Sequence, residues 1–115
     1  MIERVGVDVV ETKRVARAMR RPSFVNRILT PAEREHGMTL ARVAGRWAAK
    51  EAASKCLPEV QRWHDVSVFN RPDGSPYLVV DHPSFDSRTH VLHVSISHER
   101  GLAAAVVVLE RIGAR

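Results

Sequence analysis

Residues 45–55 read GRWAAKEAASK, and this stretch decides the fold because it forms the middle of the strongest helix signal in the chain. From Leu40 to Leu57 the sequence is rich in alanine and free of proline, and Pro58 ends the predicted helix. Apolar side chains fall almost all the way around this helix at about 100° per residue, which is typical of a central, buried helix. Its charged side chains must therefore be paired, bound to a metal or exposed at a cleft; they are Arg46, Lys50, Glu51 and Lys55.

The composition is that of one ordinary domain. The 115 residues are 44% hydrophobic, which is enough for a single core. The sequence has no apolar run of about 18 residues and no secretory signal pattern at its start, so we expect a cytoplasmic protein that does not enter a membrane. The single cysteine, Cys56, has no internal disulfide partner and is expected to pack in the core.

The net charge of +5 indicates an acidic partner without identifying it. A small basic nucleic-acid-binding domain is one alternative, although the aromatic residues are not interleaved with arginines as a base-stacking surface requires. Only three of the 18 Lys and Arg residues are lysines, and two of these, Lys50 and Lys55, lie in the central stretch. Since an ammonium and a guanidinium bind phosphate differently, this local choice points to a functional role.

The residues from Val5 to Val10 form a β-branched run that predicts a strand near the start of the chain. Alternation places Gly6, Asp8 and Val10 on one face and the three other valines on the opposite face. From this pattern alone, Asp8 faces either the protein interior or water.

A basic amphipathic helix is expected from Glu11 to Arg21, directly after this strand. Three arginines with i, i+3, i+7 spacing would form one positive stripe along it: Arg14, Arg17 and Arg21. A second helix start follows at Thr30, where Pro31 occupies the first helical position and Glu33 completes a capping box. This short helix is expected to end near Gly37.

The second half of the chain predicts two β-hairpins. The first joins residues 66–69 to 77–80 through a turn that contains Pro72, Asp73 and Gly74, and the second joins 90–98 to 102–109. The order of one strand, several helices and then antiparallel strands indicates the α+β class. We therefore expect a single domain over residues 1–115, in which an antiparallel sheet packs against the long central helix and shorter helices.

Two carboxylates on separate predicted elements, Asp8 and Glu51, could converge on a hard divalent cation such as Mg²⁺. Arg46, Lys50 and Lys55 would then meet phosphate oxygens. In the alternative interpretation, Glu51 and Lys55 form an ordinary i, i+4 ion pair on a helix surface. Spacing alone does not decide between the two.

Five motifs along the chain together resemble the holo-acyl carrier protein synthase family of phosphopantetheinyl transferases. The combination of the Gly-x-Asp strand with the Trp-x-x-Lys-Glu-x-x-x-Lys helix carries most of the resemblance, which extends from about Val5 to Glu110. In chain order the motifs are VGVD at 5–8, RILTPAE at 27–33, AGRWAAKEAASK at 44–55, GSPY at 74–77 and HVSISH at 93–98.

The resemblance implies an enzyme that moves the phosphopantetheine arm of coenzyme A to a serine of an apo acyl carrier protein and releases adenosine 3',5'-bisphosphate. It implies that Asp8 and Glu51 hold Mg²⁺ and act in catalysis with Lys55. It also implies a coenzyme site containing Arg46, Lys50, Lys55 and His98, and a homotrimer with sites at the subunit interfaces. The arginine stripe would bind the acidic carrier, from either fatty acid or polyketide synthesis.

The segment after Lys55 departs from the family pattern. Most members continue into a glycine-rich turn, whereas residues 56–61 read CLPEVQ. Proline removes a backbone donor and Glu59 adds a negative charge where backbone amides could otherwise hold phosphate. A catalytically weakened homologue that still binds carrier proteins is therefore an alternative to an active enzyme.

Overall fold

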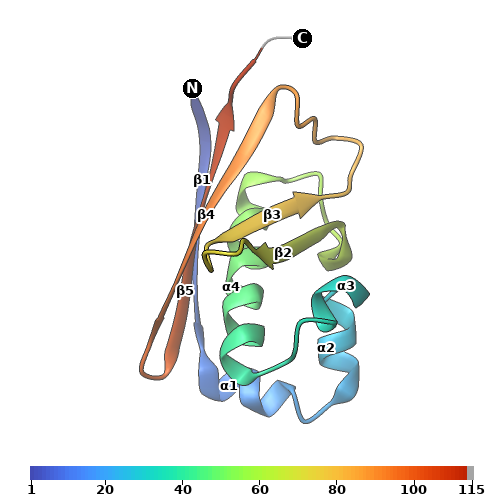
Figure 1. The fold of residues 1–115 in the computed structure, drawn as a ribbon, viewed down its shortest axis with the longest axis vertical. Helices are drawn as coiled ribbons and strands as arrows, with labels where there is room; N and C mark the ends of the chain where they lie inside the picture. Colours follow the sequence, from blue (N-terminus) through green and yellow to red (C-terminus); the bar gives the residue numbers. More distant parts are fainter. Residues whose placement is uncertain (114–115) are drawn as a thin grey trace.

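Three antiparallel strands form the main sheet of the protein, whose structure is a computed structural model describing residues 1–113 (Figure 1). The strands are β1 (Ile2–Glu11), β4 (His90–Glu99) and β5 (Leu102–Arg111), in the order β1-β5-β4. β5 is the central strand, and its inward side chains are small or branched and buried. The two edges of this sheet are therefore β1 and β4.

The long helix α4 (Leu40–Cys56) packs along one face of this sheet. It begins at Thr39, whose side chain accepts a hydrogen bond from the Arg42 backbone amide, and it ends one residue before the predicted end. Fully buried alanines line its packed side, which allows a close approach to the strands. The approach is closest at Gly6, where a Cβ atom would lie only 2.1 Å from the Ala52 carbonyl oxygen.

A second, two-stranded sheet packs beside α4 and β4. It consists of β2 (Val66–Asn70) and β3 (Pro76–Val80), preceded by the 3₁₀ turn η1 (Trp63–Asp65). Gly74 in its turn has φ +92°, a conformation that favours glycine. Both predicted hairpins are thus confirmed.

Three short helices lie at one end of the molecule: α1 (Thr12–Ala18), α2 (Pro22–Ile28) and α3 (Pro31–Arg34). The capping box at Thr30 and Glu33 is confirmed. The prediction of one helix extending to Arg21 is wrong, because α1 ends at Ala18 and Arg21 is extended before Pro22 begins α2. Proline disfavours a helical conformation in the residue that precedes it, which separates the two helices.

The predicted α+β class is confirmed, with two clusters of buried side chains between α4 and its neighbours. The face of the main sheet that points away from α4 is exposed and apolar. On β1 the valines at positions 5, 7 and 9 are 56–60% exposed, and Leu102 and Val106 on β5 are also exposed. None of the helices within residues 1–113 has the length and apolarity that a transmembrane segment requires.

Candidate active site

Asp8 on β1 and Glu51 on α4 lie next to each other, as the sequence predicted. The close approach at Gly6 brings α4 against β1, and alternation along the strand turns Asp8 toward the helix while the neighbouring valines face outward. Burial, followed by a side-chain hydrogen bond and the negative charge of Asp8, raises the pKa of Glu51 from 4.5 to about 7. The Glu51 carboxyl group therefore keeps its proton up to near neutral pH.

Lys55 lies one helical turn after Glu51 and contacts the same strand. Its ammonium donates to the Val7 carbonyl oxygen at 2.5 Å and lies 3.6 Å from Asp8 Oδ1. The Lys55 side chain is 52% exposed, so its ammonium can still reach a ligand in solution. Lys55 and Glu51, which are four residues apart on α4, thus form a cluster of three ionisable side chains with Asp8.

Asp8 and Glu51 line a recess of about 410 Å³, here called the carboxylate recess, between β1, α1, α2 and α4. Its charged lining is Asp8, Glu11, Arg14 and Glu51, and its apolar lining includes Phe24 and Trp47, whose rings meet edge to face at 5.9 Å. A polar group bound here would have an apolar wall on one side and the two carboxylates on the other.

The carboxylate pair fits a divalent cation. Asp8 Oδ2 is buried and has no hydrogen-bond partner among the described residues, which is costly unless a cation or proton satisfies it. Across residues 1–113, no group of three His, Cys, Asp or Glu side chains converges as a complete metal site. Two carboxylates completed by substrate oxygens and water suit Mg²⁺, which retains water and binds substrate phosphates.

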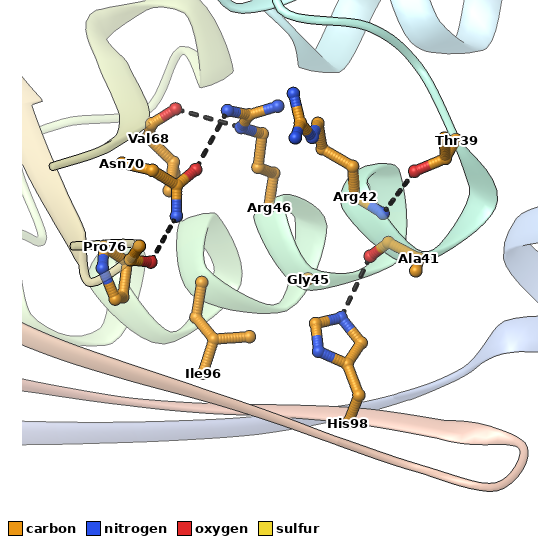
Figure 2. Close-up of a pocket in the computed structure, with 11 residues that line it drawn as sticks. Thr39, Ala41, Arg42, Gly45, Arg46, Val68, Asn70, Pro76, Ile96 and His98 are labelled. Carbon is orange, nitrogen blue, oxygen red and sulfur yellow. Dashed lines mark hydrogen bonds between the residues drawn. The ribbon is translucent and has the colours of Figure 1, made fainter. Parts of the chain in front are cut away.

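A second recess of about 520 Å³, here called the arginine recess, lies between α4, the β2–β3 hairpin and the end of β4 (Figure 2). It contains Arg42, Arg46 and His98, and no carboxylate is among its lining residues within the described chain. Asn70 and Pro76 line it from the hairpin side. This recess suits an anionic ligand.

Arg46 is the most buried polar side chain of the arginine recess, with 3% exposure. Its Nε donates to the Val68 carbonyl oxygen at 2.9 Å, and one terminal nitrogen donates to Asn70 Oδ1 at 3.4 Å. The other terminal nitrogen has no partner among the described residues. Burial lowers the pKa of Arg46, while the nearby Glu33 carboxylate acts in the opposite direction.

His98 and Arg42 also line the arginine recess. His98 points from β4 toward α4, with Nε2 3.0 Å from the Ala41 carbonyl oxygen (Figure 2). Gly45 leaves the space that the ring requires, since a Cβ there would lie 3.0 Å from His98 Nε2. Arg42 was not predicted as a site residue, although its position one helical turn before Arg46 could have indicated it.

The structure corrects the prediction that Lys50 contacts phosphate. Its ammonium is fully buried and donates to Glu33 Oε1 at 2.6 Å, to the Ile28 carbonyl at 2.5 Å and to the Trp63 carbonyl at 3.1 Å. These three acceptors use all three of its N–H groups. Lys50 therefore faces neither recess.

The basic stripe differs in shape from its prediction. Arg14 and Arg17 lie on α1, whereas Arg21 lies beyond the end of that helix, and all three are exposed. Only Arg14 of the three lines the carboxylate recess. Pro58 and Glu59, in the segment without glycine, border a third, smaller cavity beside Arg4 and line neither recess.

The two recesses lie on different sides of the molecule. The carboxylate recess is at the β1 edge of the main sheet, and the arginine recess is at the β4 edge. On α4 itself, Arg46 and Glu51 are five residues apart, which places them about 140° apart around the helix axis. A single chain thus presents two separate recesses.

The order of these motifs and recesses matches a known family. The model of the 4'-phosphopantetheinyl transferase superfamily matches residues 4–107. The chain belongs to this superfamily. Among its relatives, the holo-[acyl-carrier-protein] synthase of Anoxybacillus flavithermus is 42% identical over 123 residues, covering 97% of this chain and 98% of the relative.

Solved structures of holo-[acyl-carrier-protein] synthases share the fold of this transferase-family chain. The Bacillus anthracis protein, in complex with CoA (3',5'-ADP), is 37% identical with a TM-score of 0.83, covering 97% of this chain and 99% of that one. The Helicobacter pylori protein, in complex with coenzyme A, is 30% identical with a TM-score of 0.84, covering 93% and 100%. The recognition made from sequence motifs is therefore confirmed.

Proposed function

We propose that this protein is a holo-[acyl-carrier-protein] synthase, which transfers phosphopantetheine from coenzyme A to a serine of an apo acyl carrier protein. The observation that carries the proposal is the pairing of Asp8 with Glu51 beside Lys55. Relatives of about 40% identity over nearly the whole chain have the same name, and two similar structures contain coenzyme A or its nucleotide part.

In the proposed reaction, the serine oxygen attacks the phosphorus that carries the pantetheine arm. The new O–P bond replaces the bond to the 5'-phosphate of the nucleotide, so adenosine 3',5'-bisphosphate leaves with the bonding electron pair. The serine proton passes to Glu51 or to a water beside it. Lys55 donates to a phosphate oxygen and stabilises the charge that develops there.

Asp8 and Glu51 would hold Mg²⁺, which when bound supplies charge neutralisation at the pyrophosphate. Arg46, Arg42 and His98 would hold the nucleotide end of coenzyme A, whose phosphates match the cationic character of the arginine recess. Arg14, which lines the carboxylate recess, would bind the acidic surface of the carrier together with the exposed Arg17 and Arg21. Whether the carrier belongs to fatty acid or polyketide synthesis, and the cytoplasmic location, stay predictions.

Two recesses at opposite sheet edges fit the predicted homotrimer. In a ring of identical subunits, each subunit contacts the next through two different surfaces. The β1 edge of one subunit can thus meet the β4 edge of its neighbour, which joins a carboxylate recess to an arginine recess. The exposed valines of the main sheet supply apolar surface that such an assembly would bury.

The test is transfer itself. An apo acyl carrier protein incubated with the protein, coenzyme A and Mg²⁺ should gain the mass of one phosphopantetheine group by mass spectrometry. Asp8→Ala and Glu51→Ala should remain folded and lower the rate at least a hundredfold, because each removes a group at the reacting phosphate. A wild-type protein that binds the carrier without modifying it would instead support the weakened-homologue alternative.

A further inference from the structure

Glu33 and Lys50 form an ion pair in the interior that the proposed reaction does not use. Both side chains have 0% exposure, and Lys50 Nζ lies 2.6 Å from Glu33 Oε1. The pair connects α3 to α4. Removing two charges from water is costly, and an ion pair offsets this cost only where further hydrogen bonds complete its coordination. A functional role is therefore one reason for a protein to keep such a pair.

The hydrogen bonds around this pair are complete. Besides Lys50, the Glu33 carboxylate accepts from the Thr30 backbone amide at 2.8 Å and from the Val68 backbone amide at 3.0 Å. The Lys50 ammonium has three acceptors, as described above. Removing one member would therefore leave the other charge buried without its partner.

The same carboxylate connects to the arginine recess through one residue of β2. Val68 donates its backbone N–H to Glu33 Oε2 and accepts from Arg46 Nε at its carbonyl oxygen. The N–H and C=O of one strand residue point to the same side, so Glu33 and Arg46 bind one short segment of the strand edge side by side. Glu33 is the nearby negative charge that opposes the effect of burial on the pKa of Arg46.

These three side chains carry two positive charges and one negative charge. Lys50 neutralises Glu33, which leaves the charge of Arg46 available at the recess. One terminal nitrogen of Arg46 is buried and has no partner among the described residues.

We propose that Lys50 is a positioning residue for the nucleotide end of coenzyme A, because its neutralisation of Glu33 keeps Arg46 directed to the arginine recess. The inference rests on the proposed function, in which Arg46 contacts the coenzyme. Neither Lys50 nor Glu33 touches the ligand. Without Lys50, the unpaired Glu33 carboxylate draws the Arg46 guanidinium to itself, and the recess loses a positive charge.

This arrangement predicts a pattern of coenzyme A affinities among variants of Glu33 and Lys50. A general loss of folding stability would not produce that pattern. Lys50→Met, which keeps the length of the side chain, should weaken coenzyme A binding at least tenfold. The double variant Glu33→Gln with Lys50→Met removes both charges and should restore the affinity to within threefold of wild type. Glu33→Gln alone leaves Arg46 free and should bind coenzyme A no more weakly than wild type.

The measurement is titration calorimetry with coenzyme A at fixed ionic strength and Mg²⁺ concentration, with thermal unfolding recorded for each variant. Val107→Ala is the matched control, because Val107 is fully buried and lines neither recess. It should lower the melting temperature without changing the affinity. In transfer assays, Lys50→Met should raise the KM for coenzyme A more than it lowers kcat.

Four results would overturn the inference. Equal affinities of wild type and Lys50→Met would show that the pair is only structural, and so would failure of the double variant to recover. If Lys50→Met does not fold, tenfold weaker binding by Glu33→Gln would contradict the charge argument directly. A wild-type protein that does not bind coenzyme A at all would overturn the proposed function together with this inference.

Discussion

At the scale of single residues, Gly6 determines the geometry of the carboxylate pair. Any larger side chain would collide with the Ala52 carbonyl, so only glycine permits the contact between β1 and α4 that brings Asp8 to Glu51. The alternation of β1 could be predicted from the sequence, and with it that Asp8 shares a face with Gly6 and Val10, but not that this face points toward α4. The 2.1 Å approach could not, because it depends on how two distant segments pack.

The raised pKa of Glu51 gives a test of this geometry by stability. In the metal-free folded protein the Glu51 carboxyl group holds its proton up to about pH 7. In the unfolded chain the same group releases its proton near pH 4.5. The folded state thus binds more protons between these values, and stability is lost as pH rises through this window. Glu51→Gln should avoid that loss and be more stable than wild type at pH 8 without metal.

Solvent screening at this partly exposed group reduces the difference to about 1 kcal/mol, roughly 4 °C in melting temperature. Thermal unfolding in a chelating buffer at pH 8 and pH 4.5 measures it, and the two proteins should converge at pH 4.5. Added Mg²⁺ should raise the melting temperature of wild type and not of the variant. A constant difference across pH would contradict the raised pKa of Glu51.

The sequence predicted only part of the surroundings of the charged side chains on α4. The sequence indicated that Arg46, Lys50 and Lys55 needed partners, and each has them. It did not indicate which charge was interior, since apolar residues surround the helix on all sides. Which charge lies in the interior depends on α3 and the β2–β3 hairpin. These elements supply Glu33 and Val68 from distant parts of the chain.

At the scale of elements, Pro22 divides what the sequence pattern suggested was one basic helix. The periodic spacing of Arg14, Arg17 and Arg21 favoured a continuous stripe, whereas proline at the first helical position marks the start of α2. That signal was present in the sequence and could have predicted the break. The arginines consequently lie around the corner where α1 ends and α2 begins, and Arg14 lines the carboxylate recess.

This corner is the proposed contact surface for the carrier, and charge reversal tests it. Arg14→Glu with Arg21→Glu should raise the KM for the carrier at least tenfold, equivalent to about 1.4 kcal/mol or more, with coenzyme A affinity nearly unchanged. Wild-type activity should fall as salt rises, and the variant should lose most of this dependence. Steady-state kinetics at several ionic strengths measures both effects.

The matched control reverses two arginines outside both recesses, Arg62 and Arg88. Both are exposed, and the Arg88 ion pair with Asp86 is at the surface, where it contributes little. The control carries the same change in net charge. If it raises the KM for the carrier as much as the Arg14 and Arg21 variant does, overall charge rather than this corner governs carrier binding.

At the scale of the whole molecule, the two recesses explain why the sequence motifs lie so far apart. The Gly-x-Asp strand and the His98 strand occupy opposite edges of one sheet, and the outer face of that sheet is lined by exposed valines. The motifs predicted the α+β fold, and they pointed to Asp8 and Glu51, which line one recess, and to Arg46 and His98, which line the other. In the proposed trimer the two recesses would combine across surfaces of different subunits, which no pattern within one chain predicts.

Complementation between subunits tests this assembly. Asp8→Ala disables the carboxylate recess, while Arg42→Ala with His98→Ala disables the arginine recess, and each protein alone should be nearly inactive. When the two are co-expressed in equal amounts, a random trimer should form an intact site wherever a wild-type β1 edge meets a wild-type β4 edge. That combination occurs at roughly one interface in four, so about a quarter of the wild-type activity should return.

The Val7→Glu substitution supplies the control for assembly, because it places a charge in the apolar sheet face and should yield monomers by light scattering. Introduced into both disabled proteins, it should prevent the recovery. If the mixed subunits recover nothing while wild type is trimeric and active, each chain must hold its own complete site. Coenzyme A would then have to reach around α4 within one subunit, across the angle of about 140° that separates Arg46 from Glu51.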